Sequence, residues 1–116
     1  MNVPLLIPIK EKILTEPENF QMPDWECGTA YCIAGWAVKL SGQEKLIERN
    51  KEGLALNYSI VAKDVLGLNT ANYWDLFDAS HWYRLGVAYD HDDSPEERAN
   101  AGALAIDAFI KRYDKR

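Results

Sequence analysis

The sequence predicts an all-α protein, a compact single-domain bundle of five or six helices around a buried central helix at about residues 29–41. Three observations favour this fold class. Apolar residues recur at intervals of three and four along most of the chain, which is the spacing of one helix face. Residues that start or stop helices, such as Ser94 and Gly42, flank these segments. Strand signals are weak, because no alternating run exceeds a few residues and no Asn-Gly hairpin occurs.

The length of 116 residues is that of one domain, so we expect a single helical domain over residues 1–116. A chain of this size can bury a core without disulfides or metals. No apolar run approaches the roughly 20 residues needed to span a bilayer, so we expect no membrane partner. The apolar start, residues 1–9, lacks a basic region and holds two prolines. We therefore expect no signal peptide and a cytoplasmic location.

The first predicted helix carries its apolar residues at helical spacing. Pro8 suits the first turn of a helix better than its middle. The helix is expected to end near Thr15, because Pro17 restricts Glu16 to extended geometry. The residues expected on its inner face are Leu5, Leu6, Ile9, Ile13 and Leu14.

The central helix, at about residues 29–41, is apolar almost all round, with Lys39 as its only charge. Thr29 is a suitable N-cap, and Gly42 is a suitable stop after the last turn. A helix without a polar face is normally buried on most sides. We therefore expect this helix to form the centre of the core.

A polar excursion at residues 43–53, with a turn of helix, is expected next. Asn57 or Ser59 can cap the following helix, which Gly67 ends. The residues expected to point inward from that helix are Ile60, Val61, Val65 and Leu66. Thr70 is expected to cap a short helix with an apolar face made of Tyr73, Trp74, Leu76 and Phe77.

Residues 78–93 have the least regular pattern and contain both histidines, His81 and His91. The start of the last helix is clearer. Residues 94–97 read Ser-Pro-Glu-Glu, which supplies an N-cap, a proline at the first helical position and a glutamate at the third. This capping box predicts a helix that runs to about Tyr113.

Cys27 and Cys32 form the first candidate site. Cys32 is expected in the first turn of the central helix and Cys27 just before it, where the positive end of the helix dipole lowers a thiol pKa. A cysteine nucleophile also needs a base and a carboxylate to orient it. The candidates for these two roles are His81, His91, Asp90 and Asp92. Together these residues predict a cysteine-dependent hydrolase or transferase.

Two other interpretations of the cysteines stay open. A thiol in a buried helix packs as a small hydrophobic group, and this is the interpretation that we favour. In an exported or redox-regulated protein, Cys27 and Cys32 would instead form a disulfide. No complete catalytic constellation is visible in the sequence, which favours a protein without enzymatic activity.

The acidic run at residues 90–94 is the second candidate site. As a calcium loop it would need glycine at its sixth position and glutamate at its twelfth, where the chain has Pro95 and Ala101. The two cysteines and two histidines do not have zinc-finger spacing. We therefore expect neither a metal nor a cofactor, and interpret the run as a loop placed favourably before a helix N-terminus.

A helix-turn-helix interpretation of residues 62–77 lacks the charge that DNA binding needs. The segment that would enter the groove, residues 70–77, has no Lys or Arg and contains one Asp. The whole chain carries a net charge of −5, which opposes binding to a polyanion. We therefore expect no nucleic-acid partner.

Aromatic residues are abundant, with four Trp and six Tyr, and most are expected in the core. Some of them can form a contact surface, because Trp and Tyr dominate binding hot spots. Trp82 and Tyr83 are expected to be the most exposed pair, since they lie in the segment with the least regular pattern. Together with Tyr89 they form the predicted binding surface.

One stretch resembles a group of short uncharacterised bacterial and phage proteins. Its specific part is Cys-Gly-Thr-x-x-Cys-Ile-Ala-Gly-Trp-Ala at residues 27–37, with a looser likeness at residues 62–68 and 76–77. No activity is established for this group, so the resemblance implies no functional residue. It implies a small cytoplasmic accessory protein that acts by binding another protein.

Taken together, these patterns predict a small cytoplasmic protein–protein interaction or accessory module. Its partner would be another protein or a second copy of the chain in a homodimer. The predicted contact surfaces are the polar excursion at residues 43–53 and the aromatic segment at residues 80–89. The cysteine-dependent hydrolase or transferase, with Cys27 or Cys32 as nucleophile, is the alternative.

Overall fold

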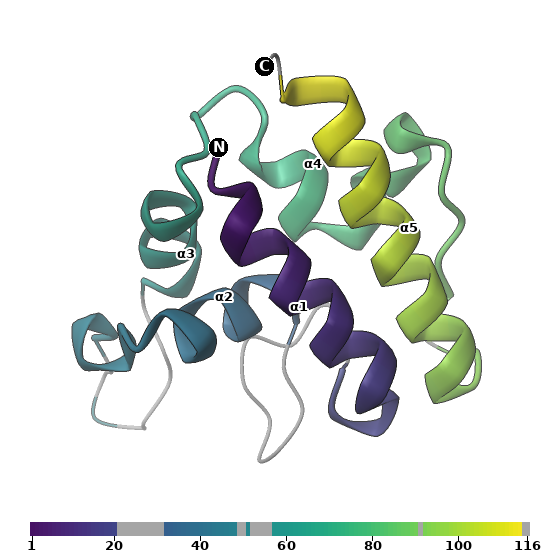
Figure 1. The fold of residues 1–116 in the computed structure, drawn as a ribbon, viewed down its shortest axis with the longest axis horizontal. Coiled ribbons are helices and arrows are strands. Elements are labelled where there is room, and N and C mark those ends of the chain that lie inside the picture. The colour runs from purple at the N-terminus through teal and green to yellow at the C-terminus, as the bar shows by residue number, and fades with distance from the viewer. Residues whose placement is uncertain (21–31, 49–50, 52–56, 91, 115–116) are drawn as a thin grey trace.

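The computed structural model describes residues 1–20, 32–48, 51, 57–90 and 92–114. Within these ranges the regular secondary structure is entirely helical (Figure 1). The elements are α1 (Val3–Thr15), η1 (Pro17–Asn19), α2 (Ile33–Ser41), η2 (Glu44–Leu46), α3 (Tyr58–Leu66), α4 (Tyr73–Phe77), η3 (Ala79–Leu85) and α5 (Pro95–Tyr113), where η denotes a 3₁₀ helix. The predicted all-α fold class is confirmed. No helix in the described part of the chain is both long and apolar enough to cross a membrane.

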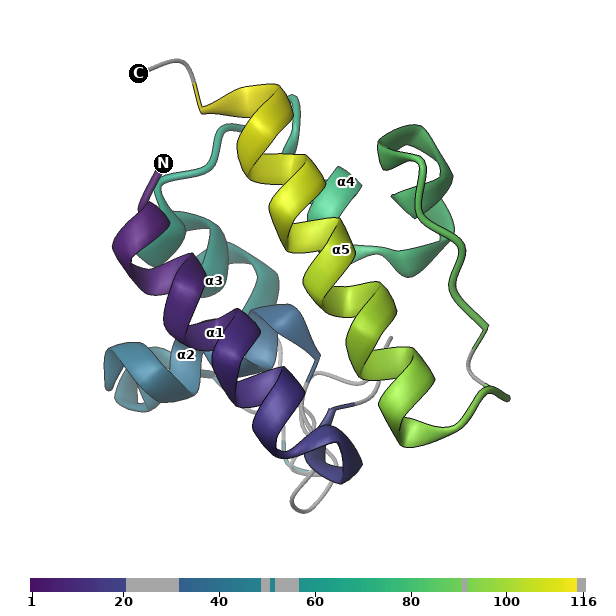
Figure 2. The ribbon, with the colours of Figure 1, turned by 45° about the vertical axis from the view of Figure 1, so that its right-hand side comes forward.

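α1 lies between two groups of helices (Figure 2). It packs against α5 on one side and against α2 and α3 on the other. α4 and η3 pack against each other, and both contact α5. One hydrophobic core receives side chains from all five α-helices and from η3. The helices therefore stabilise one another through shared burial rather than as separate pairs.

α1 begins earlier than the position of Pro8 predicts. Asn2 is its N-cap, and the Asn2 side chain accepts a hydrogen bond from the backbone N–H of Leu5. Pro8 therefore lies inside the helix instead of in its first turn. Leu6, Ile9 and Ile13 are fully buried on one face of the helix. Their burial outweighs the backbone hydrogen bond that proline cannot donate.

The predicted buried central helix is confirmed as α2. Its start was not located correctly from the sequence. The helix begins at Ile33, and Cys32 in extended conformation is its N-cap. The predicted cap, Thr29, lies outside the described residues. Residues 33–38 are all buried. Gly42 ends the helix in the left-handed conformation with a φ of 72°, as predicted.

α3 begins after Asn57 and ends at Gly67, which has a φ of 66°, as predicted. The Asn57 side chain does not cap the helix, because it bonds the backbone of Leu46 and Glu48 at the end of η2 instead. Ile60 is 56% exposed, so its predicted inward position is wrong. It lies on the outer side of a helix whose inner face holds Val61, Ala62 and Leu66.

The start of α4 depends on Asn69 rather than on Thr70. The Asn69 carboxamide oxygen accepts hydrogen bonds from the backbone N–H groups of Ala71 and Asn72, both at 3.0 Å. α5 starts as its capping box predicts. Ser94 Oγ accepts a hydrogen bond from the Glu97 backbone N–H and donates one to the Glu97 carboxylate.

At Gly102, α5 lies in close contact with the Phe20 ring. A Cβ atom at this position would lie 2.8 Å from Cζ of Phe20, the residue that follows η1. The Phe20 ring is fully buried, so it cannot simply move into solvent. The absence of a side chain at Gly102 is therefore what admits this ring to the core.

We expect Gly102→Ala to lower the free energy of unfolding by about 1–3 kcal/mol, because the added methyl group overpacks the contact with Phe20. Urea denaturation followed by circular dichroism measures the change. In the Phe20→Leu background the same substitution should cost less, because the ring edge is gone. A stabilising effect of Gly102→Ala in the native sequence, as expected from helix propensity alone, would contradict this packing.

Candidate functional site

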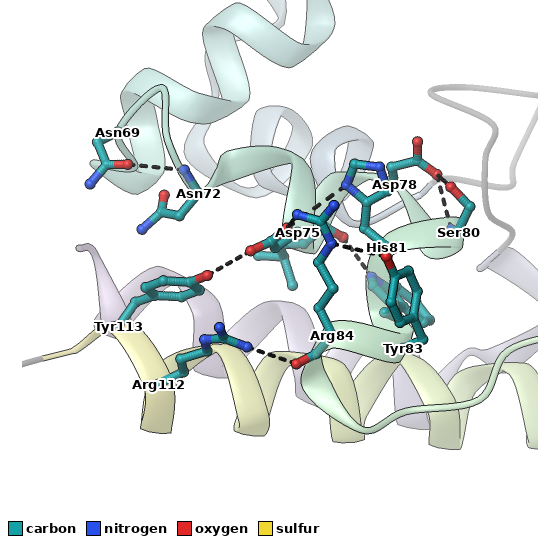
Figure 3. A network of polar contacts seen from close by, with 12 residues as sticks. Asn69, Asn72, Asp75, Asp78, Ser80, His81, Tyr83, Arg84, Arg112 and Tyr113 are labelled. Atoms are coloured by element: carbon teal, nitrogen blue, oxygen red, sulfur yellow. Dashed lines mark hydrogen bonds and ion pairs between the residues drawn. The ribbon is translucent and has the colours of Figure 1, made fainter.

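Four polar side chains meet where α4, η3 and α5 join, and we call this group the polar centre (Figure 3). Its members are Asp75 on α4, His81 and Arg84 on η3, and Tyr113 on α5. The Tyr113 hydroxyl donates a hydrogen bond of 2.6 Å to Asp75 Oδ2. Asp75 Oδ1 lies 3.8 Å from His81 Nδ1 and 3.6 Å from Arg84 Nη1. The Asp75 carboxylate, which is largely buried, thus faces partners from two other elements.

His81 has a buried ring nitrogen that faces Asp75. Nδ1 is buried and makes no hydrogen bond, since 3.8 Å to Asp75 is too long for one. The side chain as a whole is 34% exposed, and this exposure belongs to the remaining atoms of the side chain.

η3 is held in place at both ends and in its middle. At its start, Asp78 Oδ1 accepts hydrogen bonds from the Ser80 backbone N–H and hydroxyl. In its middle, Trp82 is fully buried and its indole N–H donates to the Leu76 carbonyl at 2.9 Å. At its end, Gly86 adopts the left-handed conformation with a φ of 75°. A seven-residue 3₁₀ helix is longer than most, and these contacts stabilise it.

The periodicity of η3 decides which side chains point outward. A 3₁₀ helix has three residues per turn, so residues three apart share a face. Trp82 and Leu85 turn toward the core, which leaves Tyr83 and Arg84 on the outside. Tyr83 is 69% exposed. Arg84 Nε donates a hydrogen bond of 3.3 Å to the Tyr83 hydroxyl, so the two exposed side chains are in contact.

Arg112 connects this exposed pair to the end of α5. Its Nη1 donates a hydrogen bond of 2.7 Å to the backbone carbonyl of Arg84. Figure 3 shows Arg84 between Arg112 on one side and Tyr83 on the other. We call these three residues the η3 surface. Its aromatic ring and two guanidinium groups come from two elements that the core holds together.

The predicted binding surface is therefore partly wrong. Tyr83 is exposed as predicted, but Trp82 is fully buried. Tyr89 is half-buried, and its ring packs edge to face on Trp82 with 5.1 Å between the ring centroids. The error arises because Trp82 follows a spacing of three, which a search for the α-helical period does not reveal.

The predicted cysteine site is only partly described. Cys32 is fully buried, and its Sγ accepts a hydrogen bond of 3.3 Å from the backbone N–H of Gly35. The sequence predicts Cys32 in the first turn of the central helix, but in the structure it is the N-cap of α2. Cys27 and His91 lie outside the described residues. At Cys32, a buried sulfur that serves as a helix cap is poorly placed to attack a substrate.

The sequence offers Asp90 or Asp92 as the carboxylate that orients His81 or His91, and it does not single out Asp75. Asp75 faces His81, whereas Asp90 Oδ1 accepts a hydrogen bond from the Asp92 backbone N–H within its own turn. No group of three or more His, Cys, Asp or Glu side chains that could hold a metal occurs among the residues described. The acidic run before α5 accordingly contributes a turn and a helix cap.

Comparisons with known proteins yield no match. No protein-family model matches the chain, and neither a curated protein nor a solved structure matches it significantly. The resemblance of residues 27–37 to short bacterial and phage proteins stays a prediction. What the protein does must therefore be inferred from the arrangement of its own residues.

We expect the polar centre to make folding stability fall at alkaline pH. The hydrogen bond to Asp75, followed by burial, raises the pKa of the Tyr113 hydroxyl above its ordinary value of 10.0. A group whose pKa is raised by folding stabilises the native state below its unfolded pKa, and this contribution is lost as the pH rises through its folded pKa. Chemical denaturation at a series of pH values from 8 to 11 measures the loss.

Tyr113→Phe separates this effect from general alkaline unfolding. At pH 7 the variant should lose about 1–3 kcal/mol, because a buried carboxylate loses a hydrogen bond. Above pH 10 its stability should approach that of the native sequence. Tyr83→Phe, at an exposed tyrosine, is the control and should retain the native pH dependence. Parallel pH curves for the native protein and Tyr113→Phe would refute the assignment.

We expect Cys32 to resist alkylation by iodoacetamide in the folded protein and to react on denaturation, because its sulfur is buried and bonded to Gly35. Mass spectrometry of the digested protein quantifies labelling at each cysteine, so Cys27 serves as an internal comparison. Fast labelling of Cys32 in the native protein near neutral pH would show an accessible thiolate and would favour the hydrolase or transferase interpretation.

Proposed function

We propose that the protein acts by protein–protein association and that the η3 surface carries the contact. The observation that supports this proposal is the 69% exposure of Tyr83 on a helix whose other large aromatic, Trp82, is fully buried. Tyr and Arg are enriched among the residues that dominate binding energy at protein interfaces. Here a Tyr and two Arg side chains occupy one surface.

The η3 surface is also pre-organised, which favours binding. Binding costs about 0.5–1.5 kcal/mol for each flexible side chain that must be ordered. Arg84 is already ordered by its contacts to Tyr83, Asp75 and Arg112. Tyr83 adds a large contact area with few rotatable bonds. A partner could therefore use these side chains at low entropic cost.

The remaining parts of the proposal concern location and partner. We also propose a cytoplasmic accessory role, which is the role that the sequence predicts. The partner is either another protein or a second copy of the chain. The burial of Cys32 supports a binding role over catalysis at that residue. The polar excursion is the second predicted surface, and its described part contains the exposed Leu46.

Photo-crosslinking in cells tests the proposal. We expect Tyr83→p-benzoylphenylalanine to give a discrete covalent adduct with one protein on irradiation, because the probe replaces the exposed aromatic ring of the η3 surface. Leu104→p-benzoylphenylalanine is the matched control, since Leu104 is 60% exposed on α5. The adducts are detected by electrophoresis and identified by mass spectrometry.

Each outcome of this experiment has one meaning. A specific adduct at position 83 that is absent at position 104 supports the proposal. An adduct of twice the chain mass, with a dimer in light scattering of the purified protein, identifies the partner as a second copy. No adduct at position 83, or the same set of adducts at both positions, overturns the proposal that η3 carries the contact.

A further inference from the structure

We infer that the chain forms a two-fold symmetric homodimer through the outer face of α5, with Leu104 at the centre of the contact. The inference goes beyond the proposed function, because it concerns a second surface and does not require a contact at η3. It depends on three features: two exposed leucines beside the α1–α5 contact, opposite charges at the two ends of α5, and the equal spacing of these charges about Leu104.

The first feature is a pair of exposed leucines on neighbouring helices. Leu104 is 60% exposed on α5, and Leu14 is 44% exposed on α1. The two helices pack side by side and run in opposite directions (Figure 1). An ion pair of 2.9 Å between Lys10 and Asp107 fixes their register. Leu14 lies one turn after Lys10. Leu104 lies one turn before Asp107. Because the helices are antiparallel, both leucines lie on the same side of the ion pair and form one apolar patch.

The second feature is the charge at the two ends of α5. Glu96 and Glu97 lie in the first turn, and Lys111 lies in the last. All three side chains are exposed. Glu97 uses one carboxylate oxygen to accept the Ser94 hydroxyl, which leaves its second oxygen for another partner. Within the described ranges, no ion pair includes Glu96, Glu97 or Lys111. These charges are therefore available to a second molecule.

The third feature is the spacing of the charges about Leu104. Glu97 and Lys111 each lie seven residues from Leu104, so all three side chains share one face of the helix. The helix dipole explains why acidic residues begin a helix and basic residues end it. It does not explain why the two charges are equidistant from an exposed leucine on the same face.

This spacing makes the face complementary to itself. If a second copy of α5 packs in the opposite direction with the two Leu104 side chains in contact, Glu97 of each copy lies beside Lys111 of the other. Parallel packing would instead place like charges together, which is unfavourable. A contact that matches the same residues of two identical chains is the definition of a two-fold interface, and two-fold dimers are the most common protein oligomers.

A second copy fits this face better than a partner of one charge. The first turn of α5 contains two glutamates, and the last turn contains Lys111 and Arg112. An acidic or a basic segment along the helix would therefore be attracted at one end and repelled at the other.

The symmetry of the dimer also covers the second leucine. The two-fold axis that pairs the α5 helices brings α1 of both copies to one side of that pair. Leu14 of each copy then lies beside the paired Leu104 side chains. Four antiparallel helices that share apolar positions form the arrangement of a four-helix bundle.

Sedimentation equilibrium of the full chain over a range of concentrations tests the inference. We expect a reversible equilibrium between monomer and dimer. Leu104→Lys should raise the dimer Kd at least about tenfold, because it removes the central apolar contact and brings two positive charges together. Ile60→Lys is the matched control, because Ile60 is 56% exposed on α3. It should change the Kd less than about twofold, as expected for a residue outside the interface.

Charge reversal tests the antiparallel register. Lys111→Glu places a glutamate beside Glu97, and Glu97→Lys places a lysine beside Lys111, so each variant alone should dimerise about tenfold more weakly. An equimolar mixture of the two variants should recover a dimer, because both contacts then join opposite charges. Lys45→Glu, at an exposed lysine of η2, is the control and should have the native Kd. Circular dichroism confirms that each variant is folded, since Glu97 also belongs to the capping box of α5.

Three results would overturn the inference. They are a native chain that stays monomeric at about 1 mM, a dimer whose Kd is unchanged in Leu104→Lys, and a mixture of charge variants that is no more dimeric than its components. None of these results bears on the adduct at position 83, so the η3 contact and the α5 dimer can fail separately. The probe at position 104 should join to a peptide from α1 or α5 of a second copy, which distinguishes its adduct from one formed through η3.

Discussion

The burial of one carboxylate, Asp75, determines how the last third of the chain is arranged. Removing a charge from water costs several kcal/mol unless other groups compensate for it. The compensation comes from outside α4, through the Tyr113 hydroxyl on α5 and the Arg84 guanidinium on η3, while the His81 ring of η3 faces the same carboxylate without a hydrogen bond. α4 has five residues and could not persist as an isolated helix. Its position therefore depends on the apolar core beneath it and on these three polar partners above it.

The same carboxylate links stability to the proposed binding surface. Arg84 contacts Asp75 from the inside and Tyr83 from the outside, so its orientation is a consequence of the buried charge. Trp82 provides the second constraint, because its fully buried indole fixes which face of η3 turns outward. A surface defined in this way cannot change without disturbing the core. This coupling makes the exposed side chains rigid enough to recognise a particular partner geometry.

The sequence predicted those parts of the fold that depend on local chemistry. The capping box before α5 and the glycines that end α2 and α3 are recognisable because their physical effects act within one helical turn. The polar centre could not be predicted in the same way. Asp75 and Tyr113 lie 38 residues apart, and no local pattern indicates that they meet. The sequence nevertheless contains one indication of a buried polar group, because Asp75 interrupts an otherwise aromatic and apolar helix.

Only some residues of the candidate site could therefore be predicted from the sequence. Tyr83 was predicted to be exposed because it lies in a segment with an irregular pattern. The same reasoning gave the wrong prediction for Trp82, which is buried. His81 was recognised as one of two candidate bases, but the carboxylates offered as partners were Asp90 and Asp92, and the structure places Asp75 beside it. Nothing in the sequence indicates that Arg84 and Arg112 belong to the candidate site, since an isolated arginine is normally a solvated surface residue.

The pairing of α1 with α5 has a consequence for how the chain acquires its structure. α1 is synthesised well before α5, yet α5 is one of its two principal neighbours. Until α5 is complete, the apolar face of α1 that contacts it has no permanent cover. Contacts between segments so distant in sequence form slowly, since a long loop must close before they contribute. The final assembly of the core therefore waits for α5, and the apolar face of α1 must avoid aggregation until α5 has been synthesised.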